Sequence, residues 1–317
     1  MKLCISHKKD VDGIAAAALV KAVTGSELEL VDYNELLEAL EGAEGYEEVY
    51  ICDLGMVGSK IEEELSAFRR IVSSSKLVYI DHHRVAPKVK AKIRRMGVDY
   101  VHSEKDCASV LVYDRFKDSL PEEASLLAAC AAVTDYLDDG PIARKLISRY
   151  ERMFVYLNAG MLAYALSRRA KDRDFPYKLA EWLSKLQPPY KIPGLMELAK
   201  DRMDQIWGLM KELKEKAERI GNLGFVKSNF GDCGLVANLL TGALGVPVGM
   251  AFTSSGDMYK ISLRGSEGCR WDLGRIAEEI SGELGGMGGG HRKASGAMIP
   301  KSKLDEFVKS LAERLKS

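Results

Sequence analysis

The apolar segment Lys76-Leu-Val-Tyr-Ile80 runs directly into Asp81-His82-His83. Its length and composition are typical of a buried parallel strand. Open α/β sheets carry their chemistry where strands end, because the backbone there is rigid and side chains can point to a common centre. Three potential metal ligands stand at such a position. A His-His pair alone is also common on protein surfaces, so the triplet needs support from the rest of the chain.

Strand and helix patterns alternate from the start of the chain to residue 101. In order, they predict strands over 2–5, 28–31, 48–52, 76–80 and 98–101, with helices over 14–23 and 60–72. This alternation predicts a doubly wound, mostly parallel sheet.

The sequence pattern changes after residue 101. Ala- and Leu-rich segments predict a helical insertion, with helices over 107–116, 122–135 and 142–169. Three prolines within 187–194 predict a linker, and a long charged helix is expected over 195–220. Further strands and helices, a glycine-rich loop over 285–296 and a last helix over 303–315 follow. We therefore predict an α/β protein with a first domain over 1–188, a linker and connecting helix over 189–220, and a smaller α/β domain over 221–317.

Composition limits the class of protein. The chain has 317 residues, 46% of them hydrophobic, and its 46 basic and 46 acidic residues give a formal net charge of zero. This balance argues against long-range attraction to a nucleic-acid polymer but leaves a small anionic substrate open. Six scattered cysteines suggest neither a zinc site nor a disulfide framework, and Cys4 and Cys52 are expected to be buried thiols. No apolar run reaches the roughly 18 residues of a membrane span. We expect a cytoplasmic protein that does not bind membranes.

Ligand-bearing groups recur in four loops of the first domain. They are His7-x-x-Asp10-x-Asp12, Asp53, Asp81-His82-His83 and Asp135. Carboxylate oxygens together with imidazole nitrogens suit Mn²⁺ or a similar divalent ion. Four carboxylates close together would repel one another unless cations neutralised them. Each aspartate taken singly is better explained as a helix cap or turn residue, but the four loops together favour a metal centre.

These residues resemble the DHH phosphoesterase superfamily. The motifs are Asp10-x-Asp12-Gly13, Asp53, Asp81-His82-His83 and Asp135, and the later Gly288-Gly-Gly-His291 segment is similar to the DHH-associated C-terminal domain. Order and spacing match over nearly the whole chain. The resemblance is greatest to RecJ-like and nanoRNase-like proteins.

The resemblance implies two Mn²⁺ ions. His7, Asp10 and Asp53 would hold one ion, and Asp12, Asp53, His82 and Asp135 the other. His83 would contact the scissile phosphate, and Asp81 would orient a neighbouring imidazole. His7 lies three residues before Asp10, where many members have four, so its role as a ligand is open. Asp138 and Asp139 are alternatives to Asp135.

The second domain is expected to bind substrate. Bare backbone at Gly289 and Gly290 can approach a phosphate closely, and its N–H groups can form an anion nest. His291, with Arg292 or Lys293, would add positive charge. Arg264 resembles the family's phosphate-binding arginine and can bind a phosphate in bidentate fashion. Asn229 and Asp232 are weaker candidates.

The implied activity is metal-dependent hydrolysis of a phosphoester in a cleft between the domains. We expect short single-stranded oligonucleotides as substrate, because no long basic groove is evident. Two alternatives are a RecJ-like single-strand DNA exonuclease and a phosphoesterase for cyclic dinucleotides, 3′-phosphoadenosine-5′-phosphate or other small nucleotides. The non-enzymatic alternative is a nucleotide-binding subunit of a replication complex. A homodimer is left open.

Overall fold

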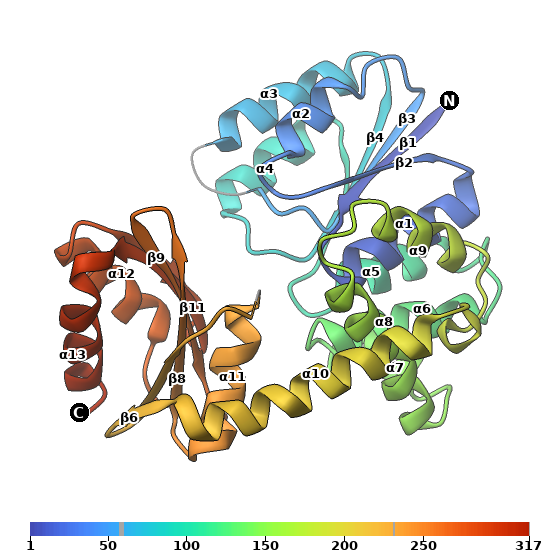
Figure 1. Cartoon of the computed structure of the whole chain (residues 1–317). Helices are drawn as coiled ribbons and strands as arrows, with labels where there is room; N and C mark the ends of the chain where they lie inside the picture. Colours follow the sequence, from blue (N-terminus) through green and yellow to red (C-terminus); the bar gives the residue numbers. More distant parts are fainter. Residues whose placement is uncertain (57–59, 231, 317) are drawn as a thin grey trace. The chain divides into compact units, whose positions relative to one another are not determined.

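The computed structural model describes residues 1–56, 60–230 and 232–316. The chain divides into two compact units, Met1–Met203 and Asp204–Ser317 (Figure 1). The division falls within helix α10 (Leu195–Lys216), in the region predicted to connect two domains.

The first unit contains a five-stranded sheet in which every strand pairs in parallel with its neighbours. The strand order is β2-β1-β3-β4-β5, with bounds β1 Lys2–His7, β2 Glu27–Val31, β3 Glu48–Cys52, β4 Lys76–Asp81 and β5 Asp99–His102. Strand β2 lies next to β1 on one side, and β3, β4 and β5 follow in order on the other side of β1. This order confirms the doubly wound sheet and places a topological switch point beside β1.

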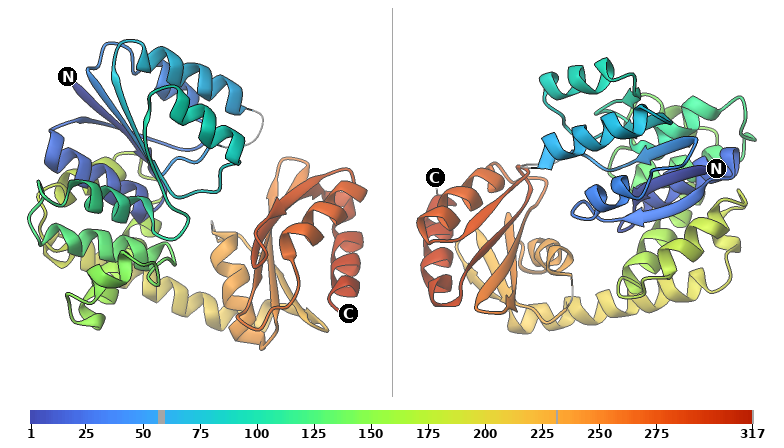
Figure 2. Two further views of the ribbon diagram at one scale, coloured as in Figure 1. Left: turned by 180° about the vertical axis from the view of Figure 1, so that it is seen from behind. Right: turned by 90° about the horizontal axis from the view of Figure 1, so that it is seen from above.

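Both faces of this sheet are apolar, which explains the continuous hydrophobic runs of its strands. In β1, Cys4 belongs to one buried cluster, whereas Leu3 and Ile5 belong to the other. The first cluster is covered by helices that include α1, α5, α6, α8 and α9, and the second by α2, α3 and α4 (Figures 1 and 2).

Nine α-helices with described bounds precede α10. They are α1 Val11–Thr24, α2 Leu36–Glu41, α3 Ile61–Val72, α4 Pro87–Arg95, α5 Ala108–Phe116, α6 Ala124–Thr134, α7 Ala143–Ile147, α8 Arg152–Arg168 and α9 Phe175–Leu183. A short 3₁₀ turn, η2 (Pro189–Lys191), lies in the proline-rich linker. The predicted helical insertion is confirmed, although the segment expected as one helix over 142–169 contains α7 and α8 separately.

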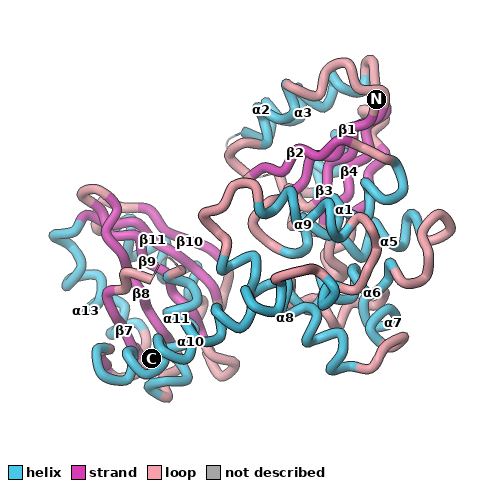
Figure 3. The backbone as a smooth tube through the Cα atoms, turned by 45° about the vertical axis from the view of Figure 1, so that its right-hand side comes forward, coloured by secondary structure: helices cyan, strands magenta, loops and turns pink. Residues whose placement is uncertain are grey.

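The second unit has a mixed six-stranded sheet in the order β10-β11-β9-β8-β7-β6. Figure 3 shows strands of this sheet in magenta with helices in cyan. Its strands are β6 Glu218–Ile220, β7 Leu223–Lys227, β8 Val248–Ser255, β9 Met258–Gly265, β10 Met287–Gly290 and β11 Ala294–Pro300. The remaining elements are α11 Cys233–Leu244, α12 Leu273–Glu283, η3 Lys301–Lys303 and α13 Leu304–Arg314. Helices α12 and α13 cover one face, and α11 with the end of α10 covers the other.

Two sequence predictions in this region were wrong. Residues 218–220 form strand β6, which pairs with β7, so the long helix ends at Lys216. The glycine-rich segment is not a free loop, because Gly288–Gly290 lie in β10 and pair with β11. The charged sequence before residue 220 favours a helix, and the glycines at 288–290 favour a loop. In both segments, pairing within the sheet outweighs this local preference.

None of the helices in the described part of the chain is both long and apolar enough to cross a membrane.

Candidate active site

The sequence-predicted ligands of the first unit lie where the parallel strands end. His7 is the last residue of β1, Asp53 follows β3, and Asp81 is the last residue of β4. Asp135 reaches the same place from the C-terminal end of α6. Since parallel strands end at one edge of the sheet, four separate loops bring their polar side chains together.

His7, Asp10 and Asp53 form the first group, with ligand atoms that all lie within 4.8 Å of one another. His7 Nδ1 lies 2.7 Å from Asp10 Oδ2 and 3.7 Å from Asp53 Oδ2. The spacing of three residues between His7 and Asp10 therefore still brings imidazole and carboxylate together. Gly13 makes this possible, because a Cβ there would lie 2.3 Å from the His7 carbonyl oxygen.

His82 is at the centre of the second group. Its Nε2 lies 3.2 Å from Asp53 Oδ1, 3.5 Å from Asp135 Oδ2 and 3.9 Å from Asp12 Oδ2. Asp53 is thus adjacent to both groups, the position that a shared ligand requires. Asp138 does not occupy this place and instead accepts a hydrogen bond from Tyr156.

Asp10 and Asp12 also cap helices, so the simple structural explanation of these residues holds in part. Asp10 is the N-cap of α1 and accepts a hydrogen bond from the Gly13 N–H. Asp12 accepts from the N–H groups of Ala108 and Ser109 at the start of α5, each at 2.8 Å. A carboxylate has about four lone-pair sites, so capping leaves acceptor capacity for a cation.

Three buried ligand atoms have no hydrogen-bond partner among the described residues: His7 Nε2, Asp53 Oδ2 and Asp135 Oδ2. Burial, followed by the charges of Asp10 and Asp12, raises the pKa of Asp53 well above its usual value. Burial and the charge of Asp12 raise the pKa of Asp135 to about 8. Crowded, desolvated carboxylates with unused oxygens are what divalent cations would stabilise, so the donor set fits the metal pair expected from sequence.

Cys107 is an unexpected neighbour of this cluster. It precedes α5, is fully buried, and lies with Asp12 and Asp135 in a group of potential ligands within 4.8 Å. Cys4 and Cys52 are also fully buried, as predicted.

Asp81 and His83 form a hydrogen-bonded pair at the edge of the cluster. Asp81 Oδ1 accepts from His83 Nδ1 at 2.8 Å, and Oδ2 lies 3.2 Å from the His83 N–H. Burial alone would lower the pKa of His83, but the hydrogen bond and charge of Asp81 outweigh it and raise that pKa. Gly55 leaves room for the ring, because a Cβ there would lie 2.6 Å from His83 Cβ.

The backbone at Asp53 is in the left-handed region, with φ of 56°. Few residues other than glycine adopt this conformation, although Asp and Asn do so more readily than most. Such strain is concentrated at functional sites, and here it accompanies the carboxylate that touches both groups.

Two site residues at the end of β2 were missed by sequence reasoning. The Tyr33 hydroxyl lies 2.9 Å from His83 Nε2, and the Tyr33 ring packs 4.6 Å from the His7 ring. Asp32 Oδ1 lies 3.6 Å from His7 Nε2. The available signal was their position directly after a predicted strand, the same criterion that identified Asp53.

His102 lies on the edge strand β5 and supports the site. Its Nε2 lies 2.7 Å from the His83 carbonyl oxygen and so donates a hydrogen bond to the DHH segment.

In the second unit, the predicted anion-binding residues gather at one end of the sheet. Arg264 pairs with Ala294 and Gly290 pairs with Ser295, so β9 and β10 flank the start of β11. Gly289 and Gly290 have φ values of 151° and 132°, which side chains other than hydrogen rarely allow. His291 follows directly and is exposed.

The neighbouring cations are partly engaged by the backbone. Arg292 donates to the Arg270 carbonyl and Lys293 to the Glu267 carbonyl, both at 3.0 Å. Arg264 lies beside the start of α11, where a Cβ at Gly234 would be 2.6 Å from its guanidinium. Asp232 is the N-cap of that helix, which gives it a structural role, and Asn229 is exposed.

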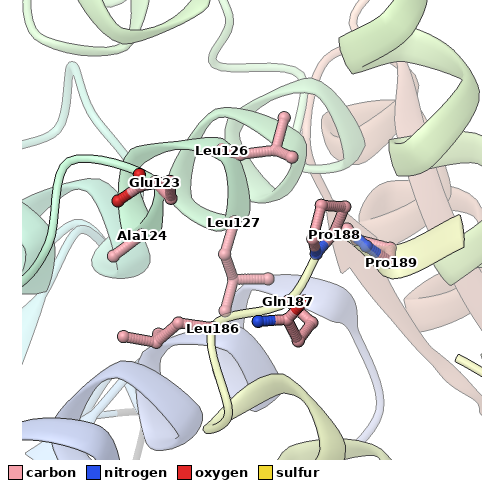
Figure 4. A pocket seen from close by; sticks show the side chains of 8 residues that line it. All are labelled: Glu123, Ala124, Leu126, Leu127, Leu186, Gln187, Pro188 and Pro189. Atoms are coloured by element: carbon pink, nitrogen blue, oxygen red, sulfur yellow. The ribbon is translucent and has the colours of Figure 1, made fainter. Parts of the chain in front are cut away.

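A small cavity lies elsewhere in the first unit (Figure 4). It holds about 10 Å³, room for a single water molecule, and is lined by residues that include Glu123, Leu127 and Pro188. Glu123 precedes α6 and Asp135 follows it, so this cavity is at the opposite end of the helix from the cluster.

Comparison with known proteins agrees with this description. Residues 224–317 match the DHHA1 domain family. A Methanocaldococcus jannaschii protein, MJ0831, is 33% identical over 112 residues, which cover 33% of this chain and 24% of that relative. This chain therefore matches about a quarter of the relative's length.

Two solved structures share the fold. A pGpG-specific phosphodiesterase, PggH from Vibrio cholerae, aligns with a TM-score of 0.64 and 13% identity, over 100% of this chain and 99% of its own. RecJ from Thermus thermophilus in complex with Mn²⁺ aligns with a TM-score of 0.65 and 16% identity, over 99% of this chain and 51% of its own. The family match thus covers residues 224–317, the two solved structures share the fold of the chain, and the Asp81-His82-His83 segment lies at the carboxyl end of β4.

Proposed function

We propose that this protein is a metal-dependent phosphoesterase that hydrolyses short single-stranded oligonucleotides. The observation that carries the proposal is the cluster of buried carboxylates and imidazoles in the first unit, with ligand atoms that have no hydrogen-bond partner among the described residues. The fold shared with a phosphodiesterase and with a manganese-bound exonuclease supports it.

The cluster would hold two divalent ions, most simply Mn²⁺. His7, Asp10 and Asp53 are the proposed ligands of one ion. The proposed ligands of the other are Asp12, Asp53, His82 and Asp135. When bound, such ions lower the pKa of a water molecule and neutralise charge on a phosphoryl group. Carboxylate and imidazole donors suit Mn²⁺.

His83 is proposed to meet the phosphoryl oxygens. Asp81 holds one ring nitrogen at 2.8 Å and thereby fixes the orientation of the ring. The other nitrogen faces the Tyr33 hydroxyl, which marks the place where a phosphoryl oxygen would compete for the same position. Burial lowers the pKa of His83, but the hydrogen bond and charge of Asp81 outweigh it and raise that pKa, and a protonated imidazole would donate from both nitrogens.

The second unit is proposed to bind a non-reacting phosphate of the substrate. Arg264 offers a guanidinium, and the backbone N–H groups beside Gly289 and Gly290 offer an anion nest. His291 would add a further donor. Binding away from the reacting centre contributes to kcat/KM when it positions the scissile bond.

Short substrates are favoured by the balanced charge of the chain, 46 basic against 46 acidic residues. A RecJ-like exonuclease acting on long DNA would gain from an extended basic groove with stacking aromatic residues. A small-nucleotide phosphoesterase is the other enzymatic alternative. A subunit that only binds nucleotides would not need so complete a set of ligands.

The test is a series of single-stranded RNA and DNA substrates from dinucleotides to long strands, assayed with Mn²⁺ at two salt concentrations. Cyclic dinucleotides and 3′-phosphoadenosine-5′-phosphate complete the panel. We expect kcat/KM to be highest for two to five nucleotides and to fall with further length, with a shallow salt dependence. Activity that rises with length and collapses in salt would favour the exonuclease.

A further inference from the structure

Cys107 is a sulfur donor beside two of the proposed metal ligands, and the two-ion assignment leaves its thiol unused. Its Sγ lies within 4.8 Å of a carboxylate oxygen of Asp12 and of one of Asp135. The other five cysteines are buried and free, and they belong to none of the ligand groups found among the described residues. The position of this thiol is therefore particular to Cys107.

The backbone around Cys107 is fixed from both sides. Ala108, the next residue, donates its N–H to Asp12 Oδ2 at 2.8 Å, which holds the start of α5 against that carboxylate. Asp106, the preceding residue, is buried and accepts from two N–H groups at the N-terminal end of α7, at 2.8 and 3.0 Å. A side chain supported in this way is held in place before any ligand arrives, as a metal site requires.

Burial alone does not explain this thiol. Free cysteines are often buried as small apolar side chains, and Cys107 is fully buried in the larger apolar cluster of the first unit. Its sulfur, however, lies beside two carboxylates. Asp12 is 1% exposed, and Asp135 Oδ2 is a buried atom without a hydrogen-bond partner among the described residues. Because buried carboxylates are costly unless they are paired, a bound cation explains this group better than apolar packing does.

His82 gives this group a fourth donor. Its Nε2 lies 3.5 Å from Asp135 Oδ2 and 3.9 Å from Asp12 Oδ2. Thiolate, imidazole and carboxylate are all donors that Zn²⁺ accepts, and Zn²⁺ most often takes four of them. A thiolate favours Zn²⁺ and similar ions, whereas carboxylates and water suit Mn²⁺. The group around His7 offers oxygen and nitrogen donors only, so the two groups differ in the ion that they should prefer.

We propose that Cys107 is a metal ligand and that, together with Asp12, His82 and Asp135, it makes this group selective for Zn²⁺ or a similarly thiophilic divalent ion. The inference rests on the metal centre of the proposed function and extends it, because it assigns different ions to the two groups. Coordination would release the thiol proton, since a coordinating thiol is deprotonated. Mn²⁺ supplied alone can still occupy both groups through their oxygen and nitrogen donors.

The experiment uses Co²⁺ as a spectroscopic probe of the metal-free protein. A cysteine ligand gives bound Co²⁺ an intense near-ultraviolet charge-transfer band, whereas oxygen and nitrogen ligands give only weak visible bands. Cys107→Ser is compared with Cys130→Ser, which makes the same change at a buried thiol outside the ligand groups. Serine suits both positions, because it can cap α5 at 107 and can donate to the Val155 carbonyl that Cys130 Sγ contacts at 3.7 Å.

In the wild-type protein and the Cys130 variant, the charge-transfer band should grow with added Co²⁺ and reach its plateau at about one ion per chain. The Cys107 variant should keep the weak visible bands and lose the charge-transfer band. Circular dichroism and melting temperatures establish that both variants are folded. Cys107→Ala provides a second variant if the serine protein is not.

Competition between Zn²⁺ and Mn²⁺, followed by the electron paramagnetic resonance signal of released Mn²⁺, measures the selectivity. The Zn²⁺ affinity of the Cys107 variant should fall at least about 100-fold, because losing a direct ligand costs more than losing an outer contact. The Mn²⁺ affinity should change much less, since Mn²⁺ gains little from a sulfur donor.

Bound Co²⁺ without a charge-transfer band in the wild-type protein would overturn the proposal. A band that persists in the Cys107 variant, equal loss of the band in both variants, or an unchanged Zn²⁺ affinity would overturn it as well.

Hydrolysis of a dinucleotide with Mn²⁺ separates this result from the proposed function. Hydrolysis by a wild-type protein that shows no charge-transfer band would count against the sulfur ligand alone. A band that depends on Cys107 in a protein without hydrolysis would count against the proposed function alone. A wild-type protein that binds no Co²⁺ would contradict both the metal centre and the role of Cys107.

Discussion

The two units place opposite chemistry at the ends of their strands. In the first unit, β1, β3 and β4 end in carboxylates and imidazoles, of which Asp53 is 2% exposed and His7 5% exposed. In the second unit, β9 and β10 end in Arg264 and in glycine backbone followed by the exposed His291. In both units, the strand ends hold these groups in fixed positions. The two units differ in burial, because buried anions need a resident cation, whereas the half-buried Arg264 and the exposed His291 suit an anion that binds and leaves.

The largest effect should follow from removing the carboxylate shared by the two groups. Asp53→Asn keeps the shape of the side chain and tolerates the left-handed backbone, so the fold should be retained. Without the shared charge, the two groups cannot hold a pair of cations, and kcat with Mn²⁺ should fall at least ~10³-fold. Steady-state kinetics and circular dichroism test this, and near-wild-type turnover would refute the shared-ligand role.

One histidine from each unit tests whether the two units differ in function. His82→Ala removes a proposed ligand and should weaken Mn²⁺ binding at least about tenfold, with a loss of kcat. His291→Ala should leave metal content unchanged and raise KM by about tenfold or less. Metal analysis after dialysis is paired with kinetics on a dinucleotide. Loss of metal in the His291 variant would show that the two strand ends are not separate in function.

Tyr33→Phe should have a moderate effect within the first unit. Phenylalanine keeps the ring that packs 4.6 Å from His7 and removes only the hydroxyl 2.9 Å from His83. We expect kcat to fall about tenfold, with metal content and melting temperature unchanged, because His83 loses a neighbour that orients it. An unchanged kcat would mean that Asp81 alone suffices to position His83.

The smallest effect on activity is expected at Glu64, a buried carboxylate away from the cluster. It is 2% exposed, and one of its oxygens has no hydrogen-bond partner among the described residues. Burial raises its pKa from 4.5 to about 7. The folded state therefore holds this proton more tightly, and stability falls as pH rises from 4.5 to 7.

Glu64→Gln should remove this part of the pH dependence, which amounts to up to about 3 kcal/mol at 1.36 kcal/mol per pKa unit. Urea unfolding of both proteins in EDTA at several pH values measures the difference, and turnover should change little. If the free energies of unfolding of the two proteins changed with pH in the same way, the raised pKa of Glu64 would be contradicted. The contrast with Asp53 distinguishes a merely buried acid from one that needs a cation.

The sequence allowed prediction of the parallel sheet because its strands are buried on both faces. Continuous apolar runs such as Leu77–Ile80 predict the strands, and the polar residues directly after them predict which carboxylates and imidazoles lie together. The cluster of acidic and histidine side chains was therefore predictable from the sequence. Its individual contacts, such as Asp12 capping α5 from 96 residues away, could not be predicted, because they depend on tertiary packing.

Strand β10 could not be predicted from the sequence, whereas the position of Tyr33 in the site could have been. Strand β10 contains the run Gly288–Gly290, which has low strand propensity, and exists because β11 pairs with it. A side chain at Gly288 would lie 2.6 Å from Ser281 Oγ, a constraint invisible in sequence. Tyr33, in contrast, was detectable, since it lies two residues after a predicted strand.

The most direct test of the account is the number of Mn²⁺ ions that bind to the wild-type protein. Titration calorimetry gives the stoichiometry, and electron paramagnetic resonance reports whether two bound ions are magnetically coupled. We predict two ions per chain with a coupled signal, which Asp53→Asn converts to one uncoupled ion or none. A single ion in the wild-type protein, or two uncoupled ions unaffected by the change at Asp53, would contradict a metal pair built on the strand ends of the first unit.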